Sequence, residues 1–551
     1  MNQGKFIIGA VLTVMAVSCQ NYTDKVSLDI TQPIYPLVTL KKDCPALRLE
    51  FVNTTTEAYK LEKLEFSLEG STEPDDISGA SIYVNEKPGR LSREIIPDSL
   101  IASVKPSGNK ISFSLNETVD CDTIVYWLCL NLKDDAASAD KRIKIACTKA
   151  DTNEGLIAFN QPETEPFRIG VALRQIDQDG VCSSRIPGLI TAKNGSLIAM
   201  YDARRDSYDD LQGDIDLAIN ISDDGGSTWS PMQVVLTMGN YGGLPKKYNG
   251  VSDGNIMVDE TNGDIYVAGC WMHGVLDPKT GEWVKELSDT STVWNHQWQS
   301  GSKAGFELNQ TCQFLITKST DNGKTWSEPR NLTRDIKKKD WWLLAPAPGR
   351  GITMEDGTLV MPIEGRNEVG KQFSTIMWSR DKGETWNVGE PAFYNVNECQ
   401  VVELSDHSLM LNMRLRSNRH KQEHNGRAIC VTKDMGKTWT EHPTSQSALI
   451  EPACQGGLHR HNYTRDGEKR HILIFTNPSD KDQRVNFTLK VSFDDGETWP
   501  EEYWMLLDKE WGYGYSCITS IDEETIGIFY EGSQAEIQFQ AIPLKDILKE
   551  K

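Results

Sequence analysis

Short apolar runs, each introduced by turn-forming residues, recur along the last two thirds of the chain. They include GSLIAMYDA, GDIYVAGCW, GTLVMPIEG, HSLMLNMRL and RHILIFTN. Runs of this length that follow Gly, Asp, Asn or Ser are typical of β-strands. The pattern therefore predicts an all-β chain of many short strands joined by tight turns.

One turn motif repeats five times among these runs, with the form Ser/Thr-x-Asp-x-Gly-x-Thr-Trp. The copies start 97, 60, 53 and 60 residues apart and occupy 222–229, 319–326, 379–386, 432–439 and 492–499. Repeats of this period indicate an array or a propeller, and 50–60 residues suit one four-stranded blade. We expect a six-bladed β-propeller over 166–551, with one blade lacking this Asp box. The longest interval holds either a motif-free blade or an insertion.

The Asp box itself reads as structure rather than as a site. Its Asp is expected to bond backbone amides two residues on, and its Gly to adopt a backbone angle that other residues resist. Its Trp is expected to pack between neighbouring sheets. A calcium loop needs a bidentate Glu at its end, and none of the five copies supplies one. We expect no metal and no cofactor.

The region before the repeat has a different pattern. Residues 20–165 carry β alternation with polar breaks, as in LEKLEFSLEG, ISFSLNETV and KRIKIACTK, which predicts a separate β-sandwich. The stretch NQPETEPF at 160–167 reads as a linker. The domain could bind carbohydrate or space the propeller from a membrane, and the sequence leaves both open.

Residues 1–19 resemble an export signal. Lys5 precedes a twelve-residue apolar run that is too short to span a bilayer as an anchor. The run ends in AVSC, which resembles a lipoprotein signal with Cys19 as the lipidated residue; simple cleavage and secretion is the alternative. We expect an exported protein in the periplasm, at the outer membrane or cell surface as a lipoprotein, or secreted. Membrane contact is expected only through that lipid.

The net charge limits the classes of partner that the chain can bind, and the spacing of the cysteines indicates whether they form disulfides. The formal net charge of -21 over 551 residues argues against a nucleic-acid partner, because phosphate binding needs a cationic surface. An anionic substrate must instead be bound by a local cluster of arginines. The twelve cysteines include no CxxC pair, and buried free thiols are favoured over a disulfide framework.

Arg185, in the segment SRIPG ahead of the first Asp box, begins a series of motifs outside the repeat. Together with the boxes they resemble the exo-sialidases (neuraminidases) of bacteria and animals, of the glycoside hydrolase family 33 type, over residues 167–545. In that family three arginines bind the carboxylate of sialic acid. The resemblance assigns these to Arg185, Arg414 in LMLNMR and Arg484 in SDKDQR. Guanidinium groups suit this role because they bind a carboxylate bidentately.

The resemblance also assigns the groups that carry the reaction. Asp210, in DDLQGD, takes the place of the acid/base, with Asp209 one residue out of register as the alternative. Glu398, in NVNECQVVEL, and Tyr515, in GYGYSCITS, take the places of the general base and the nucleophile. Tyr513 lies two residues away and is the alternative nucleophile.

Three further residues are implied to shape the substrate pocket. Arg204, in YDAR, matches a pocket arginine, and Glu531, in FYEGS, matches the acid that orients Arg185. Asp253, in GVSDG, matches a substrate contact, but the family has Pro where this chain has Gly254, which puts the shape of that loop in doubt.

A tyrosine nucleophile has a physical reason. The anomeric carbon of sialic acid already bears a carboxylate, which would repel a second anion, whereas a neutral phenol meets no such repulsion. A phenol with an ordinary pKa of about 10 needs a base to activate it, and Glu398 is placed to take its proton. Sialidases are an exception to the carboxylate nucleophile of most retaining glycosidases.

The expected function is exo-hydrolysis of terminal α-linked sialic acids from glycoproteins, glycolipids and oligosaccharides, with retention of configuration. Sialylated glycans are thus the expected partners. The alternatives are a sialic-acid-binding propeller without hydrolysis, a non-enzymatic interaction propeller, and a trans-sialidase. Serine-hydrolase and zinc-hydrolase motifs are absent from the sequence.

Overall fold

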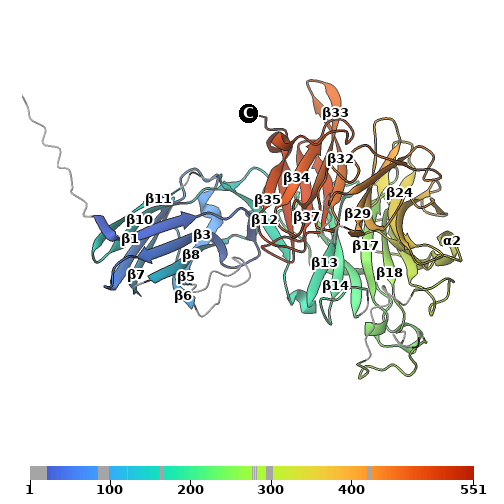
Figure 1. Cartoon of the computed structure of the whole chain (residues 1–551), viewed down its shortest axis with the longest axis horizontal. Helices are drawn as coiled ribbons and strands as arrows, with labels where there is room; N and C mark the ends of the chain where they lie inside the picture. Colours follow the sequence, from blue (N-terminus) through green and yellow to red (C-terminus); the bar gives the residue numbers. More distant parts are fainter. Residues whose placement is uncertain are drawn as a thin grey trace, which may run out of the picture.

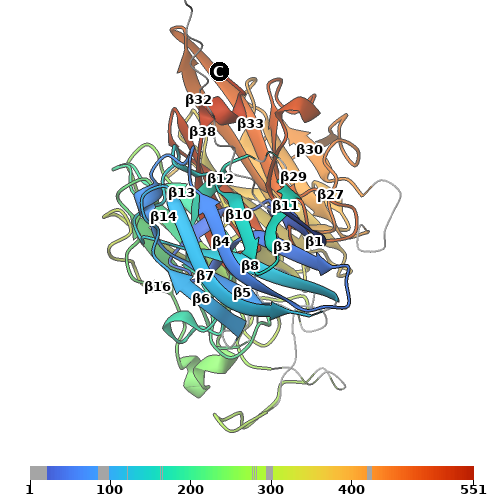
Figure 2. The same ribbon diagram turned by 90° about the vertical axis from the view of Figure 1, so that its left-hand side faces the viewer.

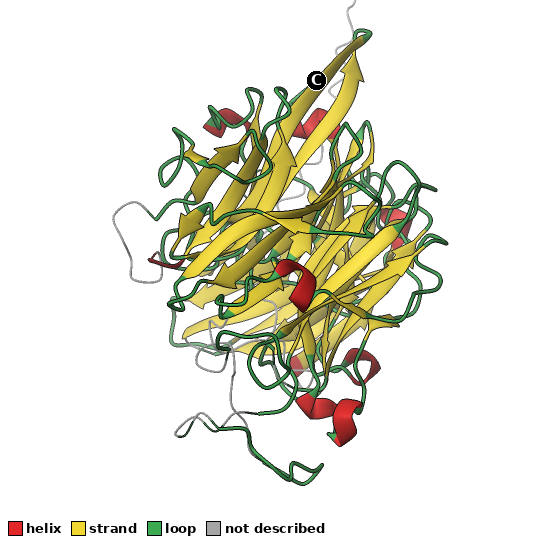
Figure 3. Ribbon diagram, turned by 90° about the vertical axis from the view of Figure 1, so that its right-hand side faces the viewer, coloured by secondary structure: helices red, strands yellow, loops and turns green. Residues whose placement is uncertain are grey.

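The computed structural model describes residues 22–84, 99–120, 122–161, 163, 165–211, 213–275, 277, 280, 282–292, 302–417 and 425–550. The expected export signal at 1–19 lies outside this range. The described chain is almost entirely β-structure (Figure 3), with the N-terminal domain at one end and the propeller at the other (Figure 1). None of its helices is long and apolar enough to cross a membrane.

The N-terminal domain is one continuous sheet of nine strands in the order β6-β5-β8-β3-β1-β11-β10-β4-β7 (Figure 2). Along β4, Tyr59 and Leu61 are buried, as are Leu64 and Phe66 after a shift in register, whereas the residues between them are exposed or half-buried. The apolar core of this sheet is continuous with apolar residues of the propeller, and within the sheet Phe66 packs edge-on against Phe113. Its strands are β1 (Tyr22–Thr31), β3 (Cys44–Asn53), β4 (Tyr59–Ser67), β5 (Ile77–Val84), β6 (Leu100–Val104), β7 (Lys110–Val119), β8 (Asp122–Leu132), β10 (Ala146–Thr152) and β11 (Gly155–Asn160).

The propeller has six blades, each an antiparallel sheet in its main strands. Blades one and two contain β13 (Ser183–Thr191), β14 (Leu197–Arg204), β15 (Ile215–Ser222) and β16 (Gln233–Leu236), then β17 (Val251–Val258), β18 (Ile265–Trp271), β19 (Gln313–Ser319), β20 (Arg330–Asn331) and β22 (Gly349–Arg350). Blade three contains β21 (Leu343–Pro346), β23 (Ile352–Thr353), β24 (Leu359–Arg366), β25 (Gln372–Ser379), β26 (Asn387–Val388) and β27 (Phe393–Tyr394). Blades four and five contain β28 (Val396–Glu403), β29 (Leu409–Leu415), β30 (Ala428–Thr432) and β31 (Thr440–Glu441), then β32 (Gly457–Arg465), β33 (Glu468–Pro478), β34 (Phe487–Ser492) and β35 (Met505–Asp508).

Blade six closes the ring with strands from both ends of the chain. It contains β2 (Leu37–Thr39), β9 (Arg142–Ile143), β12 (Phe167–Arg174), β36 (Ser516–Asp522), β37 (Thr525–Tyr530) and β38 (Ile537–Pro543). Two of these, β2 and β9, come from the N-terminal region, and β2 pairs in parallel with β12. The N-terminal region is therefore not joined to the propeller by a linker alone. Short helices α2 (Thr333–Ile336) and α3 (Leu544–Ile547) and five 3-10 turns complete the described elements, the turns being η1 (Pro74–Asp76), η3 (Gln178–Gly180), η4 (Tyr241–Gly243), η5 (Lys246–Tyr248) and η7 (Glu501–Tyr503).

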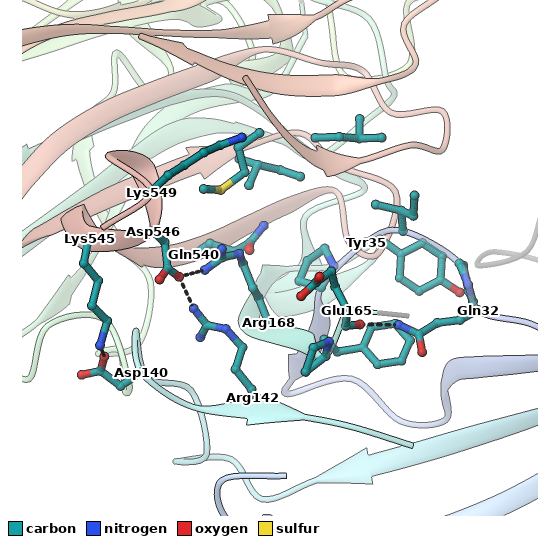
Figure 4. Close-up of a pocket in the computed structure, with 18 of the residues that line it drawn as sticks. Gln32, Tyr35, Asp140, Arg142, Glu165, Arg168, Gln540, Lys545, Asp546 and Lys549 are labelled. Carbon is teal, nitrogen blue, oxygen red and sulfur yellow. Dashed lines mark hydrogen bonds and ion pairs between the residues drawn. The ribbon is translucent and has the colours of Figure 1, made fainter. Parts of the chain in front are cut away.

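An ion-pair cluster also joins the two regions. Arg142 and Arg168 both donate to the Asp546 carboxylate, at 2.5 and 2.7 Å (Figure 4). These residues line a cleft of about 1050 Å³ between the N-terminal region and blades five and six. The three side chains are each about a quarter exposed, and their ion pairs add to the strand pairing that connects the N-terminal region to the propeller.

The five Asp boxes all close the turn between the third and fourth strands of a blade. In the first, one oxygen of Asp224 accepts the Thr228 amide at 2.9 Å and the other accepts the Thr228 hydroxyl at 2.6 Å. The expected partner two residues on is thus wrong, because the acceptor reaches four residues on. Trp229 packs against Phe539 of blade six at 5.2 Å, and a Cβ on Gly226 would lie 2.0 Å from that ring. The other four boxes repeat the Asp–Thr bonds.

The long interval between the first two boxes is an insertion and not an extra blade. Strands β18 and β19 pair in one sheet, although 41 residues separate Trp271 from Gln313. The blade without a box is the closing one. The ten cysteines in the described part of the chain are free, and nine of them are buried.

Candidate active site

Three side chains from blades four and six meet near the propeller axis. The Tyr515 hydroxyl donates to Oε1 of Glu398 at 2.5 Å, and Nη1 of Arg414 donates to Oε2 of Glu398 at 2.5 Å and to the Tyr515 oxygen at 2.9 Å. Tyr515 directly precedes β36, whereas Glu398 and Arg414 lie on the neighbouring strands β28 and β29. All three are at most 8% exposed. The contacts form a closed triangle in a site shielded from water.

The pKa values of Tyr515 and Glu398 are shifted in opposite directions. Burial raises the pKa of the Tyr515 phenol well above its ordinary value, and Arg414 only partly offsets this. Burial also opposes ionisation of Glu398, but the Arg414 guanidinium and the Tyr515 hydrogen bond outweigh it and lower the pKa of that carboxyl. At neutral pH the pair is therefore a neutral phenol hydrogen-bonded to a carboxylate, which is the protonation state required for general-base activation.

Arg185 is held by a carboxylate from the closing blade. Its Nε and Nη2 donate to the two oxygens of Glu531 at 2.6 and 3.1 Å, a bidentate pair. A bulge in β13 and a positive φ of 66° at Ile186 turn the chain so that the Ile186 amide also donates to Glu531, at 2.9 Å. The Tyr515 amide donates to the same carboxylate at 3.2 Å. Glu531 thus fixes the backbone on both sides of the site.

The three arginines surround one ring. The guanidinium carbons of Arg185 and Arg484 lie 5.6 and 5.5 Å from the centroid of Tyr515, and Arg414 donates to its hydroxyl. Arg484 comes from the turn between β33 and β34 and donates to the carbonyl of Tyr513 at 2.8 Å. Each guanidinium has five N–H donors, and these bonds use only part of that number. The cluster can bind a carboxylate above the ring of Tyr515.

The two candidate tyrosines occupy different positions. The Tyr513 ring lies under the Arg185 guanidinium at 3.9 Å, and its carbonyl accepts Arg484. The Tyr515 ring carries its hydroxyl to Glu398. Glu398 therefore contacts the hydroxyl of Tyr515, whereas Tyr513 contacts Arg185 and Arg484.

Asp210 lies in the loop after β14, among other acids. The next residue, Leu211, is buried and donates its amide to the Ser252 hydroxyl at 3.3 Å, and Ser252 donates to Asp202 at 2.6 Å. Asp210 is half-buried, and its charge acts on Asp253 of β17. Asp209, the alternative, is exposed and accepts the hydroxyl of a nearby serine.

Arg204 and Asp253 shape this acidic side of the site. Arg204 is 2% exposed and donates to Asp202 at 2.9 Å and to the Tyr208 carbonyl at 2.9 Å, so it holds the loop that carries Asp210. Asp253 sits at a β-bulge with a φ of 55°. A Cβ on Gly254 would lie 2.7 Å from a methionine of β14, which explains a glycine there.

Asp253 makes the stability depend on pH. Burial raises its pKa well above the ordinary value, and the charges of Asp202 and Asp210 raise it further. Because the folded pKa of Asp253 exceeds its unfolded pKa, the contribution of this group to stability falls as pH rises from about 4, by at most about 1.4 kcal/mol per pH unit. Asp253→Asn removes this loss, so its stability relative to wild type should increase between pH 4 and 8 in urea titrations. A stability difference between Asp253→Asn and wild type that stays flat from pH 4 to 8 would contradict the assignment.

The sequence analysis missed three charged groups at the site. Asp202 lies in the quoted YDAR motif and bonds to Arg204, and Glu364 of β24 is 2% exposed. Burial, followed by the charge of Glu398, raises the pKa of Glu364 well above its ordinary value. Arg416 lies close enough to Glu398 and Arg414 for their charges to act on it. A charged residue at a buried strand position was the available signal for Glu364, in MPIEGR.

The cluster is organised for acid–base and nucleophilic chemistry around a bound anion. Within the described residues, no group of three or more His, Cys, Asp or Glu side chains could hold a metal ion. Glu364 connects the Tyr–Glu pair to the carboxyl groups around Asp210, because the charge of Glu398 acts on Glu364 and the charges of Glu364 and Asp210 act on Asp253.

Comparison with known proteins agrees with this geometry. A family model described as a BNR repeat-like domain matches residues 186–502. A sialidase of Bacteroides fragilis (strain YCH46) is 38% identical over 81% of this chain and 78% of its own length, and a sialidase of Clostridium perfringens is 28% identical over 65% and 87%. The solved structure of Hadza microbial sialidase Hz136 matches with a TM-score of 0.83 at 32% identity, over 94% of this chain and 99% of that one. The chain therefore belongs to the sialidase family, and it is an enzyme of the exo-α-sialidase class.

Proposed function

We propose that this enzyme removes terminal α-linked sialic acids from glycoproteins, glycolipids and oligosaccharides by a retaining mechanism with Tyr515 as the nucleophile. The observation that carries the proposal is the 2.5 Å bond from the Tyr515 hydroxyl to Glu398 inside the ring of three arginines. A lectin needs the arginines but has no use for a buried tyrosine paired with a base.

The first half-reaction forms a covalent sialosyl–tyrosine. Arg185, Arg414 and Arg484 bind the carboxylate of the sugar and so place its anomeric carbon over the phenol. As the Tyr515 oxygen bonds to that carbon, Glu398 accepts the phenol proton. The carboxyl of Asp210 protonates the departing glycosidic oxygen, and the shortened glycan leaves.

The second half-reaction reverses these roles. The Asp210 carboxylate takes a proton from water, which attacks the anomeric carbon from the face that the glycan left. The bond to Tyr515 breaks, and its oxygen regains the proton held by Glu398. Two inversions give net retention, so the α-sialoside releases α-sialic acid.

Proton NMR of the released sugar tests this stereochemistry. The α-anomer of sialic acid should appear first from a sialyllactose substrate and then mutarotate to the β-anomer. Initial release of the β-anomer would exclude a covalent intermediate. Transfer to added lactose in preference to water would favour the trans-sialidase alternative.

A further inference from the structure

Two cysteines lie together at the base of the insertion in blade two. Cys270 is next to the end of β18, and Cys312 directly precedes β19, the strand that pairs with β18. The register sets Trp271 opposite Gln313, so Cys270 and Cys312 are diagonal neighbours on the same face of the sheet. The two cysteines enclose residues 271–311, which contain the whole insertion.

The two thiols contact each other inside a small apolar cluster. Cys270 and Cys312 are 0% and 1% exposed, and both belong to the cluster that contains Leu211. Their side chains are joined by a hydrogen bond between the two sulfur atoms. Because Leu211 directly follows Asp210, the cysteine pair is part of the core on which the loop of Asp210 packs.

Two cations that are largely buried lie close enough to Cys312 for their charges to act on it. Lys337 is 4% exposed, and its ammonium donates to two backbone carbonyls. The hydrogen bond from Cys270 lowers the pKa of the Cys312 thiol, and the charges of Lys337 and Arg366 lower it further. The same hydrogen bond and burial raise the pKa of Cys270. Cys312 therefore stands where a thiolate, the form that reacts with disulfides, is stabilised.

Cys44 and Cys129 of the N-terminal domain show that paired strands alone do not bring two thiols together. They lie on the neighbouring strands β3 and β8, and both are fully buried. However, Cys44 is opposite Leu130 and Cys129 is opposite Pro45, so the two cysteines are one residue out of register. Their side chains therefore point to opposite faces and belong to different apolar clusters. The register at the base of the insertion, in contrast, places both thiols on one face.

We propose that Cys270 and Cys312 form a disulfide that closes the insertion at its base. A disulfide stabilises a protein mainly by constraining the unfolded chain, and the effect grows with the length of the enclosed loop. The bond would also fix the core on which Leu211 and the loop of Asp210 pack. An exported protein, which residues 1–19 lead us to expect, folds in a compartment where disulfides persist.

The bond forms during folding, by exchange with an oxidant that carries a disulfide, because both cysteines are buried in the folded protein. The Cys270 thiolate of the unfolded chain attacks one sulfur of the oxidant, and the other sulfur leaves as a thiolate. As the blades fold, Cys312 reaches Lys337 and Arg366, loses its proton, attacks the sulfur of Cys270 and expels the second thiolate. The two cysteines are oxidised, the oxidant is reduced to two thiols, and the protons that the cysteines release balance those that the thiols take up.

Refolding of the full chain from urea tests the proposal. One sample refolds with oxidised and reduced glutathione and the other with a reductant alone. Free thiols are then blocked in denaturant with iodoacetamide, and mass spectrometry of a digest identifies the linked peptides. A peptide that links Cys270 to Cys312 is expected only in the oxidised sample, whereas Cys44 and Cys129 should carry the blocking group in both. The melting temperature of the oxidised sample should be higher by roughly 5 °C.

Matched variants separate the bond from the packing of the thiols. Cys270→Ala should abolish both the linked peptide and the difference in melting temperature between the two samples. Cys44→Ala, which also removes a fully buried thiol, should keep both. If Cys270→Ala does not fold, the comparison of the two wild-type samples decides alone.

Three results would overturn the proposal. The first is blocking of Cys270 and Cys312 in the oxidised wild type, which would show that the bond does not form. The second is a link from either residue to another cysteine, which would show that the native pair is different. The third is a linked pair with equal melting temperatures in both samples, which would show that the bond does not stabilise the insertion. None of these measurements depends on the proposed function.

Discussion

Replacing Tyr515 with phenylalanine is expected to lower kcat/KM for a fluorogenic sialoside by on the order of a thousandfold or more. The variant keeps the ring between the arginines, so the carboxylate site survives, but it removes the oxygen that bonds to Glu398. KM should therefore change far less than kcat. The measurement is steady-state kinetics near neutral pH, with circular dichroism to check folding.

Tyr513→Phe is the matched control for this substitution. Its ring packs on Arg185 and its carbonyl accepts Arg484, and both contacts survive loss of the hydroxyl. Activity within a few-fold of wild type is expected. If Tyr513→Phe were the inactive variant and Tyr515→Phe the active one, the alternative tyrosine would be the nucleophile.

Replacing Glu531 with glutamine is expected to cost about 3 kcal/mol of folding stability and most of the activity. Arg185 is 11% exposed, and its side chain loses the charge that compensates its burial. The glutamine also offers one carbonyl oxygen where the carboxylate now accepts the guanidinium and two backbone amides. The free energy of unfolding from urea titration and kcat/KM should fall together.

Glu524→Gln supplies the comparison for a surface ion pair. Glu524 pairs with Arg465 at 2.6 Å, but its side chain is 58% exposed. A loss below about 1 kcal/mol with unchanged activity is expected there. Equal losses in the two variants would show that burial of the Arg185 pair has no special weight.

The repeat could be read from the sequence because its physics is local. Each Asp box closes a turn through side chains four residues apart, so its spacing marks the third and fourth strands of a blade directly. The strand β2 could not be predicted in the same way. Three residues between Leu37 and Thr39 carry no periodicity, and their pairing with β12 depends on where the two regions of the chain meet.

The same distinction, between local motifs and contacts made by distant parts of the chain, applies to the site. The positions of Arg185, Glu398, Arg414 and Tyr515 follow from family motifs, and the structure brings them together. Glu364 has no such motif, and Asp202 lies in the YDAR motif without being assigned a role there. The proximity of both to the site depends on the packing of separate blades. The pH dependence expected of Asp253 depends in turn on those neighbours, so the sequence alone could not predict it.

Covalent trapping tests the central claim most directly. In a 2,3-difluorinated sialic acid, the attacking tyrosine oxygen should displace the fluoride from the anomeric carbon. The fluorine that remains at carbon 3 then slows hydrolysis of the sugar–tyrosine bond. Mass spectrometry of a proteolytic digest should then find the added sugar on Tyr515 in the wild type and no adduct in Tyr515→Phe. An adduct on Glu398 or Tyr513, or an active enzyme that never forms one, would contradict the account.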